Sequence, residues 1–151
     1  MSRLLRAYRL TEYQAGGIAI RIGRRVPHAL FAGMRARGGT LVTAWNPFSR
    51  RMPEGWNIRM QRHLCERLRR FVVRDAEGSL QHWQEAMLLV AGDPRPVFRL
   101  ATHFRQRSVV VLRAGQKARL LLVPYHCHCE ERMRRSNPHP GAHPHGGCRV
   151  G

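Results

Sequence analysis

Three polar side chains lie directly beside apolar segments of this 151-residue chain. Asn46 follows the apolar segment 40–45, Glu85 opens the apolar segment 85–92, and Gln106 comes shortly before another apolar segment. In open α/β sheets, ligands bind where strands end and the loops to the next helices begin. We therefore expect these side chains to gather in one pocket. The predicted ligand-binding residues are Thr43, Asn46, Ser49, Asn57, Glu85 and Gln106.

Amides, hydroxyls and one carboxylate suit the hydrogen bonding of a base, a sugar or an amide. The set predicts a small polar ligand, with a nucleotide as one candidate. Glu85 is the candidate catalytic residue, as a general base whose pKa is raised by burial. No Ser/His/Asp order, glycine-rich phosphate loop, HExxH motif or carboxylate pair accompanies it. Enzymatic activity therefore stays open, and no cofactor is predicted.

A structural interpretation of the same residues also stands. An Asn before a Pro, such as Asn46, caps turns, and an inward Asn at a helix start can hold a loop by binding its backbone. Asn57 lies at the start of an apolar helical stripe that continues through Met60, Leu64 and Leu68. As a buried amide it needs hydrogen-bond partners.

The end of the chain is rich in histidine and cysteine. His126, Cys127, His128 and Cys129 are the candidate metal ligands, but their spacing does not match a zinc finger. Prolines and glycines dominate the residues that follow, which is typical of disorder. We predict no metal site and a disordered tail over 126–151.

The charge of the chain is strongly positive. Lys and Arg total 27 against 9 acidic residues, for a net charge of +18. The single lysine is Lys117. The cations are densest at Arg21, Arg24 and Arg25, at Arg67, Arg69 and Arg70, and at Arg105 and Arg107. Non-sequence-specific binding of nucleic acid through this arginine-rich surface is the alternative function. A codon bias that replaces lysine by arginine explains the composition equally well.

Strand and helix patterns alternate along the chain. Strand patterns cover 17–23, 40–45, 85–92, 108–115 and 118–123. Helix patterns begin at Pro27, at about Trp56 (to Arg70) and at Pro94. The predicted loops are 46–55 and 74–79. This order predicts a single α/β domain over 6–125, with helices packed on a mixed sheet and a C-terminal β-hairpin.

No apolar run is long enough for a membrane helix, and the basic N-terminus lacks the apolar stretch of a secretory signal. The sequence therefore predicts a cytoplasmic protein without a membrane partner. It does not indicate the oligomeric state.

Five segments occur in an order that resembles a known family. They are AYRLTEYQ, LVTAWNPFSR, EGWNIRMQRHL, WQEAMLLVAG and ATHFRQRSVVVL. Over residues 7–123 the chain resembles domain-of-unknown-function family 3293, small uncharacterised bacterial proteins with a TAWNP motif. The matching positions are Tyr8, Thr11, Tyr13, Thr43, Ala44, Asn46, Pro47, Ser49, Asn57, Glu85 and Gln106. Arg105 and Arg107 depart from the family pattern, and beside a pocket they would narrow it or favour anions.

Overall fold

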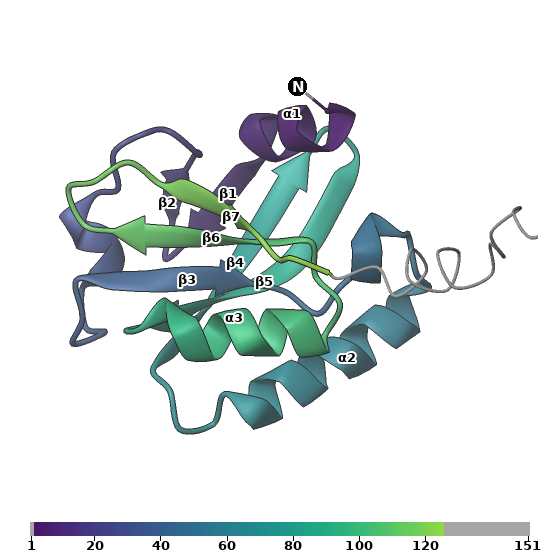
Figure 1. Cartoon of the computed structure of the whole chain (residues 1–151). Helices are drawn as coiled ribbons and strands as arrows, with labels where there is room; N and C mark the ends of the chain where they lie inside the picture. Colours follow the sequence, from purple (N-terminus) through teal and green to yellow (C-terminus); the bar gives the residue numbers. More distant parts are fainter. Residues whose placement is uncertain (1, 126–151) are drawn as a thin grey trace, which may run out of the picture.

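The computed structural model describes residues 2–125, which form three α-helices and one seven-stranded sheet (Figure 1). The elements are α1 (Arg3–Leu10), β1 (Glu12–Ala15), β2 (Ile18–Ile20), β3 (Gly38–Val42), α2 (Glu54–Arg67), β4 (Val73–Leu80), β5 (Trp83–Ala91), α3 (Pro94–His103), β6 (Ser108–Arg113) and β7 (Arg119–Leu122). Two 3₁₀ turns, His28–Phe31 and Pro47–Ser49, are the remaining elements. The strand order is β2-β1-β4-β5-β3-β6-β7.

The predicted α/β class and the C-terminal hairpin of β6 and β7 are confirmed. The direction of the strands differs from the mixed sheet that the sequence predicted, because every pairing between the named strands is antiparallel. The reason is β4, which occupies the predicted loop 74–79 and pairs along its whole length with β5. An additional strand between α2 and β5 reverses the direction in which β5 runs.

The chain before residue 17 also contains structure that the sequence patterns did not show. Helix α1 leads into β1, which pairs with both β2 and β4. The helix predicted from Pro27 is only a 3₁₀ turn, His28–Phe31. The other predicted helices are present as α2 and α3, and α3 begins with Asp93 as its N-cap and Pro94 at its first position.

Apolar side chains cover both faces of the sheet. Alternation along β5 sends Met87 and Leu89 to one face and Leu88 and Val90 to the other. The first face packs around the 3₁₀ turn that carries Leu30 and Phe31. The second face is covered by α2 and α3, which contribute Leu64, Val97 and Leu100 among other residues. Because α2 and α3 pack on the second face, neither helix covers the first face.

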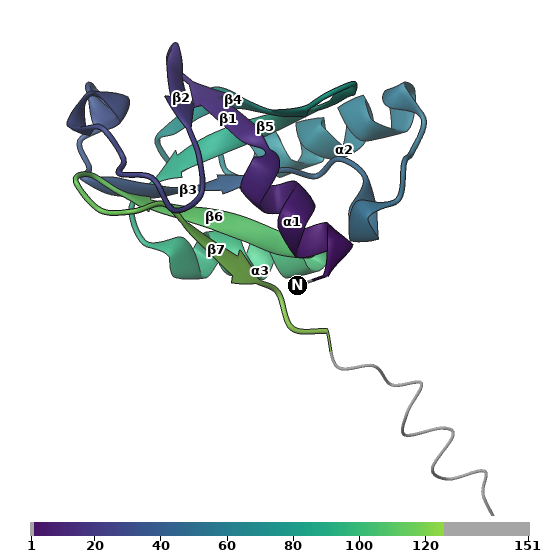
Figure 2. The ribbon, with the colours of Figure 1, turned by 90° about the horizontal axis from the view of Figure 1, so that it is seen from above.

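The sheet curls so that the segment 22–26, after β2, reaches the hairpin at the other edge (Figure 2). Gly23 N–H donates to Ala118 O, and Val26 N–H donates to Gln116 O, both at 2.8 Å. Isolated β-bridges join Ile22 to Ala118 and Val26 to Ala114. Backbone hydrogen bonds thus link the two edges of the sheet at the end where β3 begins, which we call the basic end. The opposite end, where β3 finishes, is the cavity end.

In the part of the chain that the structure describes, no helix is long and apolar enough to cross a membrane. The predicted tail over 126–151, with the candidate metal ligands His126, Cys127, His128 and Cys129, lies outside the described residues.

Candidate functional site

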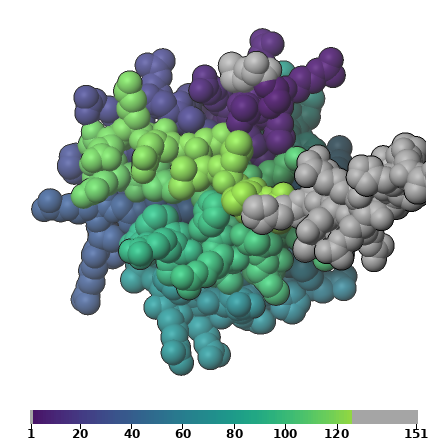
Figure 3. Space-filling view, in the orientation of Figure 1, coloured from purple at the N-terminus to yellow at the C-terminus, as the bar shows by residue number. Residues whose placement is uncertain are grey.

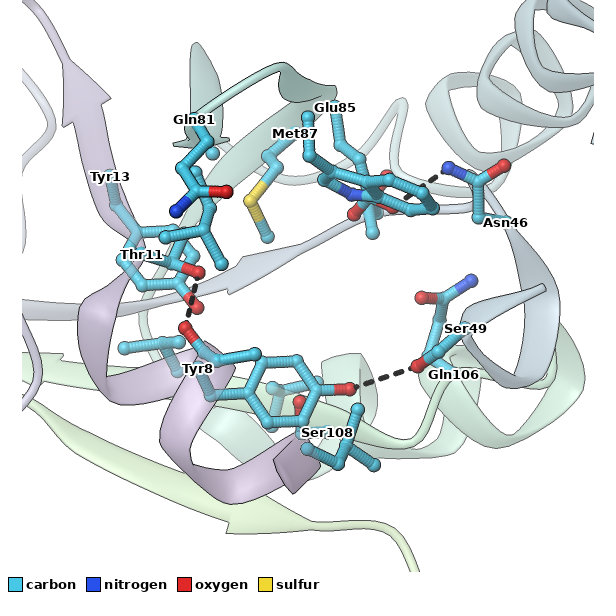
Figure 4. A pocket seen from close by; sticks show the side chains of 18 residues that line it. Tyr8, Thr11, Tyr13, Asn46, Ser49, Gln81, Glu85, Met87, Gln106 and Ser108 are labelled. Atoms are coloured by element: carbon cyan, nitrogen blue, oxygen red, sulfur yellow. Dashed lines mark hydrogen bonds between the residues drawn. The ribbon is translucent and has the colours of Figure 1, made fainter. Parts of the chain in front are cut away.

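A cavity of about 360 Å³ opens at the cavity end, on the first face of the sheet. Helix α1 lies over it, and β4, β5 and the start of β6 form its walls (Figure 4). It is lined by Leu4, Ala7, Tyr8, Thr11, Tyr13, Thr43, Asn46, Ser49, Gly78, Leu80, Gln81, Trp83, Glu85, Met87, Gln106, Ser108, Val109 and Val110. Elements from both halves of the chain thus meet around one space.

Five of the six predicted ligand-binding residues line this cavity: Thr43, Asn46, Ser49, Glu85 and Gln106. The sixth, Asn57, is 2% exposed and lies behind Asn46, outside the lining. Thr43 lines the wall, but its hydroxyl already donates to Ala86 O at 2.6 Å. The side chains that are open to a ligand are therefore fewer than the sequence suggested.

Asn46 sits where the chain leaves β3 in a left-handed conformation, with φ of 48°. Asn tolerates this region better than most residues. Asn57 supports the turn from α2: its Oδ1 accepts from Asn46 N–H, and its Nδ2 donates to Asn46 Oδ1, both at 3.0 Å. Asn46 Oδ1 also accepts from Met52 N–H at 2.8 Å. Only the Asn46 Nδ2 group remains for the cavity.

The Asn46 Nδ2 group forms a hydrogen bond with Glu85, which lies near the start of β5. Asn46 Nδ2 donates to Glu85 Oε1 at 2.8 Å. Burial raises the pKa of the Glu85 carboxyl, while hydrogen bonds from Asn46 and Trp83 lower it by less. Within the described residues, Glu85 forms no ion pair with a cation. It is a partly buried acid without a positive partner, which is costly for folding.

Gln106 lies across the cavity mouth from Glu85 and is 7% exposed. Its Nε2 donates to Trp45 O at 3.0 Å and to Phe104 O at 3.3 Å. These bonds orient the amide, so the atom left to face the cavity is the acceptor Oε1 (Figure 4). Tyr125 OH holds the same segment by donating to Gln106 O at 2.7 Å.

Helix α1 forms one side of the cavity, and none of its residues was among the six predicted ligand-binding residues. Tyr8 OH and Ser49 Oγ are 3.4 Å apart and connect α1 to the loop after β3. Tyr13, on β1, is buried below it, and this burial raises the pKa of its hydroxyl. The available signal was the family resemblance, which included Tyr8, Thr11 and Tyr13. Leu80, Gln81, Trp83 and Met87 come from the β4–β5 hairpin, whose first strand was predicted as a loop.

The loop after β5 lies at the basic end, away from the loop after β3, because β3 and β5 are antiparallel. Arg105 and Arg107 do not line the cavity. Arg107 Nε donates to Phe48 O at 3.0 Å, and Phe48 N–H donates to Arg105 O at 2.8 Å. The two arginines thus hold the loop and leave the cavity width unchanged.

The charge of the cavity is opposite to that of the chain. Among the described residues that line it there is one carboxyl, that of Glu85, and no arginine, lysine or histidine. Apolar side chains and hydroxyl groups make up most of the rest. In residues 2–125, no three His, Cys, Asp or Glu side chains cluster in a way that could hold a metal ion.

Residues 42–109 match the family model described as "Protein of unknown function (DUF3293)". Over these residues the chain is similar to this family, as the sequence segments indicated. The matched segment runs from the end of β3 to the start of β6, and it contains all six predicted ligand-binding residues. No curated protein and no solved structure matches the chain.

Proposed function

We propose that the cavity of this protein binds a small organic molecule that presents a positive charge or N–H donors to Glu85 and Gln106. The observation that carries this proposal is the isolation of Glu85. A mostly buried carboxyl costs folding energy unless something compensates it. Asn46 and Trp83 supply hydrogen bonds, but no described cation supplies a charge. A donor on a ligand would complete its environment.

The size and the walls narrow the ligand class. A volume of about 360 Å³ lies near the lower end of typical small-molecule pockets. Leu80, Met87 and Val110 are apolar, and Trp83 and Tyr8 add aromatic surface. A small planar ring with amine, amidine or ring N–H groups fits this combination. A nucleobase or an aromatic amine is therefore favoured over a nucleotide, whose phosphate would meet a carboxylate and no cation.

The proposal concerns binding. A carboxylate with a raised pKa is also a stronger base than an ordinary one. If a bound ligand is turned over, Glu85 is the group that would take up a proton from it. Asn46 would then orient this base, because its Nδ2 donates to Oε1.

The test is a thermal-shift panel of amines, guanidines, nucleobases and nucleosides, run beside carboxylates and nucleoside monophosphates of similar size. A ligand at a hundred times its Kd stabilises a protein by about 2.7 kcal/mol. We expect stabilisation by members of the first group, and its loss in Glu85→Gln. The same substitution at the exposed Glu77, on the neighbouring strand β4, is the matched control.

Stabilisation by phosphates or carboxylates alone would contradict the proposed ligand class. Stabilisation that survives in Glu85→Gln and in Tyr8→Phe would place the ligand outside this cavity.

A further inference from the structure

A second hollow, of about 380 Å³, lies at the basic end. It is bordered by the start of β3, the start of α3 and the turn between β6 and β7. Four of its lining residues are cations: Arg37, Arg113, Lys117 and Arg119. We call this hollow the basic cleft. Figure 3 shows the start of β3 (blue) and the β6–β7 hairpin (green) side by side at the left of the molecule.

The register of the sheet gathers these cations from distant parts of the chain. Gly38 pairs with Arg113, and Ala114 N–H donates to Arg37 O at 2.8 Å. Arg119 pairs with Val111 across the hairpin. Gly92 N–H donates to Gly38 O at 2.9 Å, which sets the start of α3 against β3. The cleft is thus a fixed feature of the fold rather than a run of basic residues in the sequence.

The four cations have no counter-charge among the described residues. None of them forms an ion pair or a side-chain hydrogen bond there, and all four are exposed. The one acid in the lining is Asp93, whose carboxylate caps α3 and lies 3.1 Å from Arg95 Nε. The cleft therefore keeps a strong positive charge toward solvent.

The closure of the sheet extends this surface. An isolated β-bridge pairs Arg25 with Lys117, and Arg25 Nη1 donates to Gly115 O at 2.8 Å. Arg24 follows the same path, since its carbonyl oxygen accepts from Ala118 N–H at 2.9 Å. The cations of 22–26 thereby lie next to those of the β6–β7 turn.

We propose that the basic cleft and the adjoining segment 22–26 bind the phosphate backbone of a nucleic-acid duplex. Several unpaired cations on one rigid surface match a ligand that carries several phosphates, because each neutralised phosphate releases counterions. The described lining of the cleft contains no aromatic side chain, so it offers no platform for the bases of a single strand. Contacts to the backbone position a duplex without reading its sequence.

This surface includes Arg24 and Arg25 but none of the other arginines in the clusters seen in the sequence. Arg67, Arg69 and Arg70 lie at the end of α2 beside Glu66. Arg107 is engaged with Phe48 O, and Arg21 forms an ion pair with Glu12 at 2.8 Å. The cleft lies at the opposite end of the sheet from the cavity, so its occupancy does not depend on the cavity ligand.

The experiment measures fluorescence anisotropy of a short labelled DNA duplex against the full chain, titrated between about 50 and 200 mM salt. The test variant is Arg37→Gln/Arg113→Gln/Lys117→Gln. The matched control, Arg59→Gln/Arg62→Gln/Arg67→Gln, removes the same charge from exposed positions on α2. All six side chains are exposed, and circular dichroism checks that both variants fold.

We expect the cleft variant to bind about tenfold or more weakly, with the log–log salt slope reduced by about 0.9 for each phosphate that the variant no longer neutralises. The control should keep most of the affinity and slope. Equal losses in both variants would overturn the proposal, because they would reflect net charge alone. Displacement of the duplex by inorganic pyrophosphate at stoichiometric concentration would also overturn it, since the cleft would then be a site for small anions. Binding to anionic lipid vesicles without duplex binding would assign the surface to membranes instead.

Discussion

At the scale of single residues, Glu85 has the clearest expected dependence on pH. Burial raises its pKa in the folded chain above the ordinary value of 4.5. The protonated form therefore favours folding, and this contribution to stability is fully present below the unfolded-state pKa. It is lost as the pH rises through the folded-state pKa. Above the folded-state pKa the ligand-free protein thus retains the cost of an ionised, mostly buried carboxyl.

We therefore expect Glu85→Gln to be more stable than the wild type at neutral pH, by roughly 1 kcal/mol. The glutamine keeps an oxygen that can accept from Asn46 Nδ2 and removes the buried charge. The gain should shrink toward pH 4, where the wild-type carboxyl is protonated. Chemical denaturation at a series of pH values measures this. A Glu85→Gln variant less stable than the wild type at neutral pH would identify the carboxylate as structural.

Asn57 should behave in the opposite way, because it is structural. Asn57→Ala leaves the buried N–H of Asn46 without an acceptor and removes a donor from Asn46 Oδ1. An unsatisfied buried group costs about 1–3 kcal/mol, so we expect a loss of this size in the free energy of unfolding. Gln116→Ala, at an exposed turn position, is the control, with an effect within about 0.5 kcal/mol. Loss of ligand affinity with unchanged stability would instead make Asn57 a direct ligand contact.

The sequence was informative about single residues where a polar group interrupts an apolar pattern. Asn57 on the inward stripe of its helix is buried, as the spacing required, and Glu85 beside an apolar strand has the raised pKa that its position suggested. The spacing could not show that Asn57 forms hydrogen bonds with Asn46 and does not line the cavity. Which of two amides faces a ligand depends on partners that are distant in the sequence.

At the scale of elements, α1 is the least firmly held part of the site. None of its residues is buried, and its one side-chain hydrogen bond to the loop after β3 joins Tyr8 and Ser49 at 3.4 Å. Yet Leu4, Ala7 and Tyr8 line the cavity from above. A helix with little burial opens at low free-energy cost.

We expect backbone amides of α1 to exchange hydrogen much faster than those of β3 and β5, and to slow when the cavity is filled. Hydrogen-exchange mass spectrometry of the free and ligand-saturated protein measures this difference. Exchange in α2 serves as the internal reference, because α2 packs on the other face of the sheet. Equal protection of α1 and α2 in the free protein would contradict the expectation.

Elements with strong apolar periodicity could be predicted, and those without it could not. Strands β3, β5, β6 and β7 and helices α2 and α3 were all found near their predicted positions. Strand β4 reads VRDAEGSL, where charged residues and a glycine are typical of a loop. It forms a strand because β5 offers a long apolar partner. Because β4 was predicted as a loop, the sheet was expected to be mixed, whereas β5 is antiparallel to both of its neighbours.

At the scale of the whole molecule, positive charge is the dominant electrostatic feature. Residues 1–125 carry 23 cations and 7 acids, and the described residues contain only two ion pairs between an arginine and a carboxylate. Repulsion among unpaired charges destabilises a compact state and is screened by salt. We expect the melting temperature to rise by a few degrees between low and physiological sodium chloride, as measured by calorimetry. A fall in the melting temperature would show that the ion pairs outweigh the repulsion.

The link between 22–26 and 114–118 also bears on how the chain folds. Its hydrogen bonds join residues as far as 95 positions apart, as in Gly23 and Ala118, whereas β4 and β5 pair through a tight turn. Long-range contacts form late because their loop-closure entropy must first be offset by structure already in place. In pulse-labelled refolding, the amides of Gly23, Val26, Gly115 and Ala118 should gain protection after those of the β4–β5 hairpin. Arg24 and Arg25 would then join the basic cleft late in folding, since this closure places them beside the β6–β7 turn.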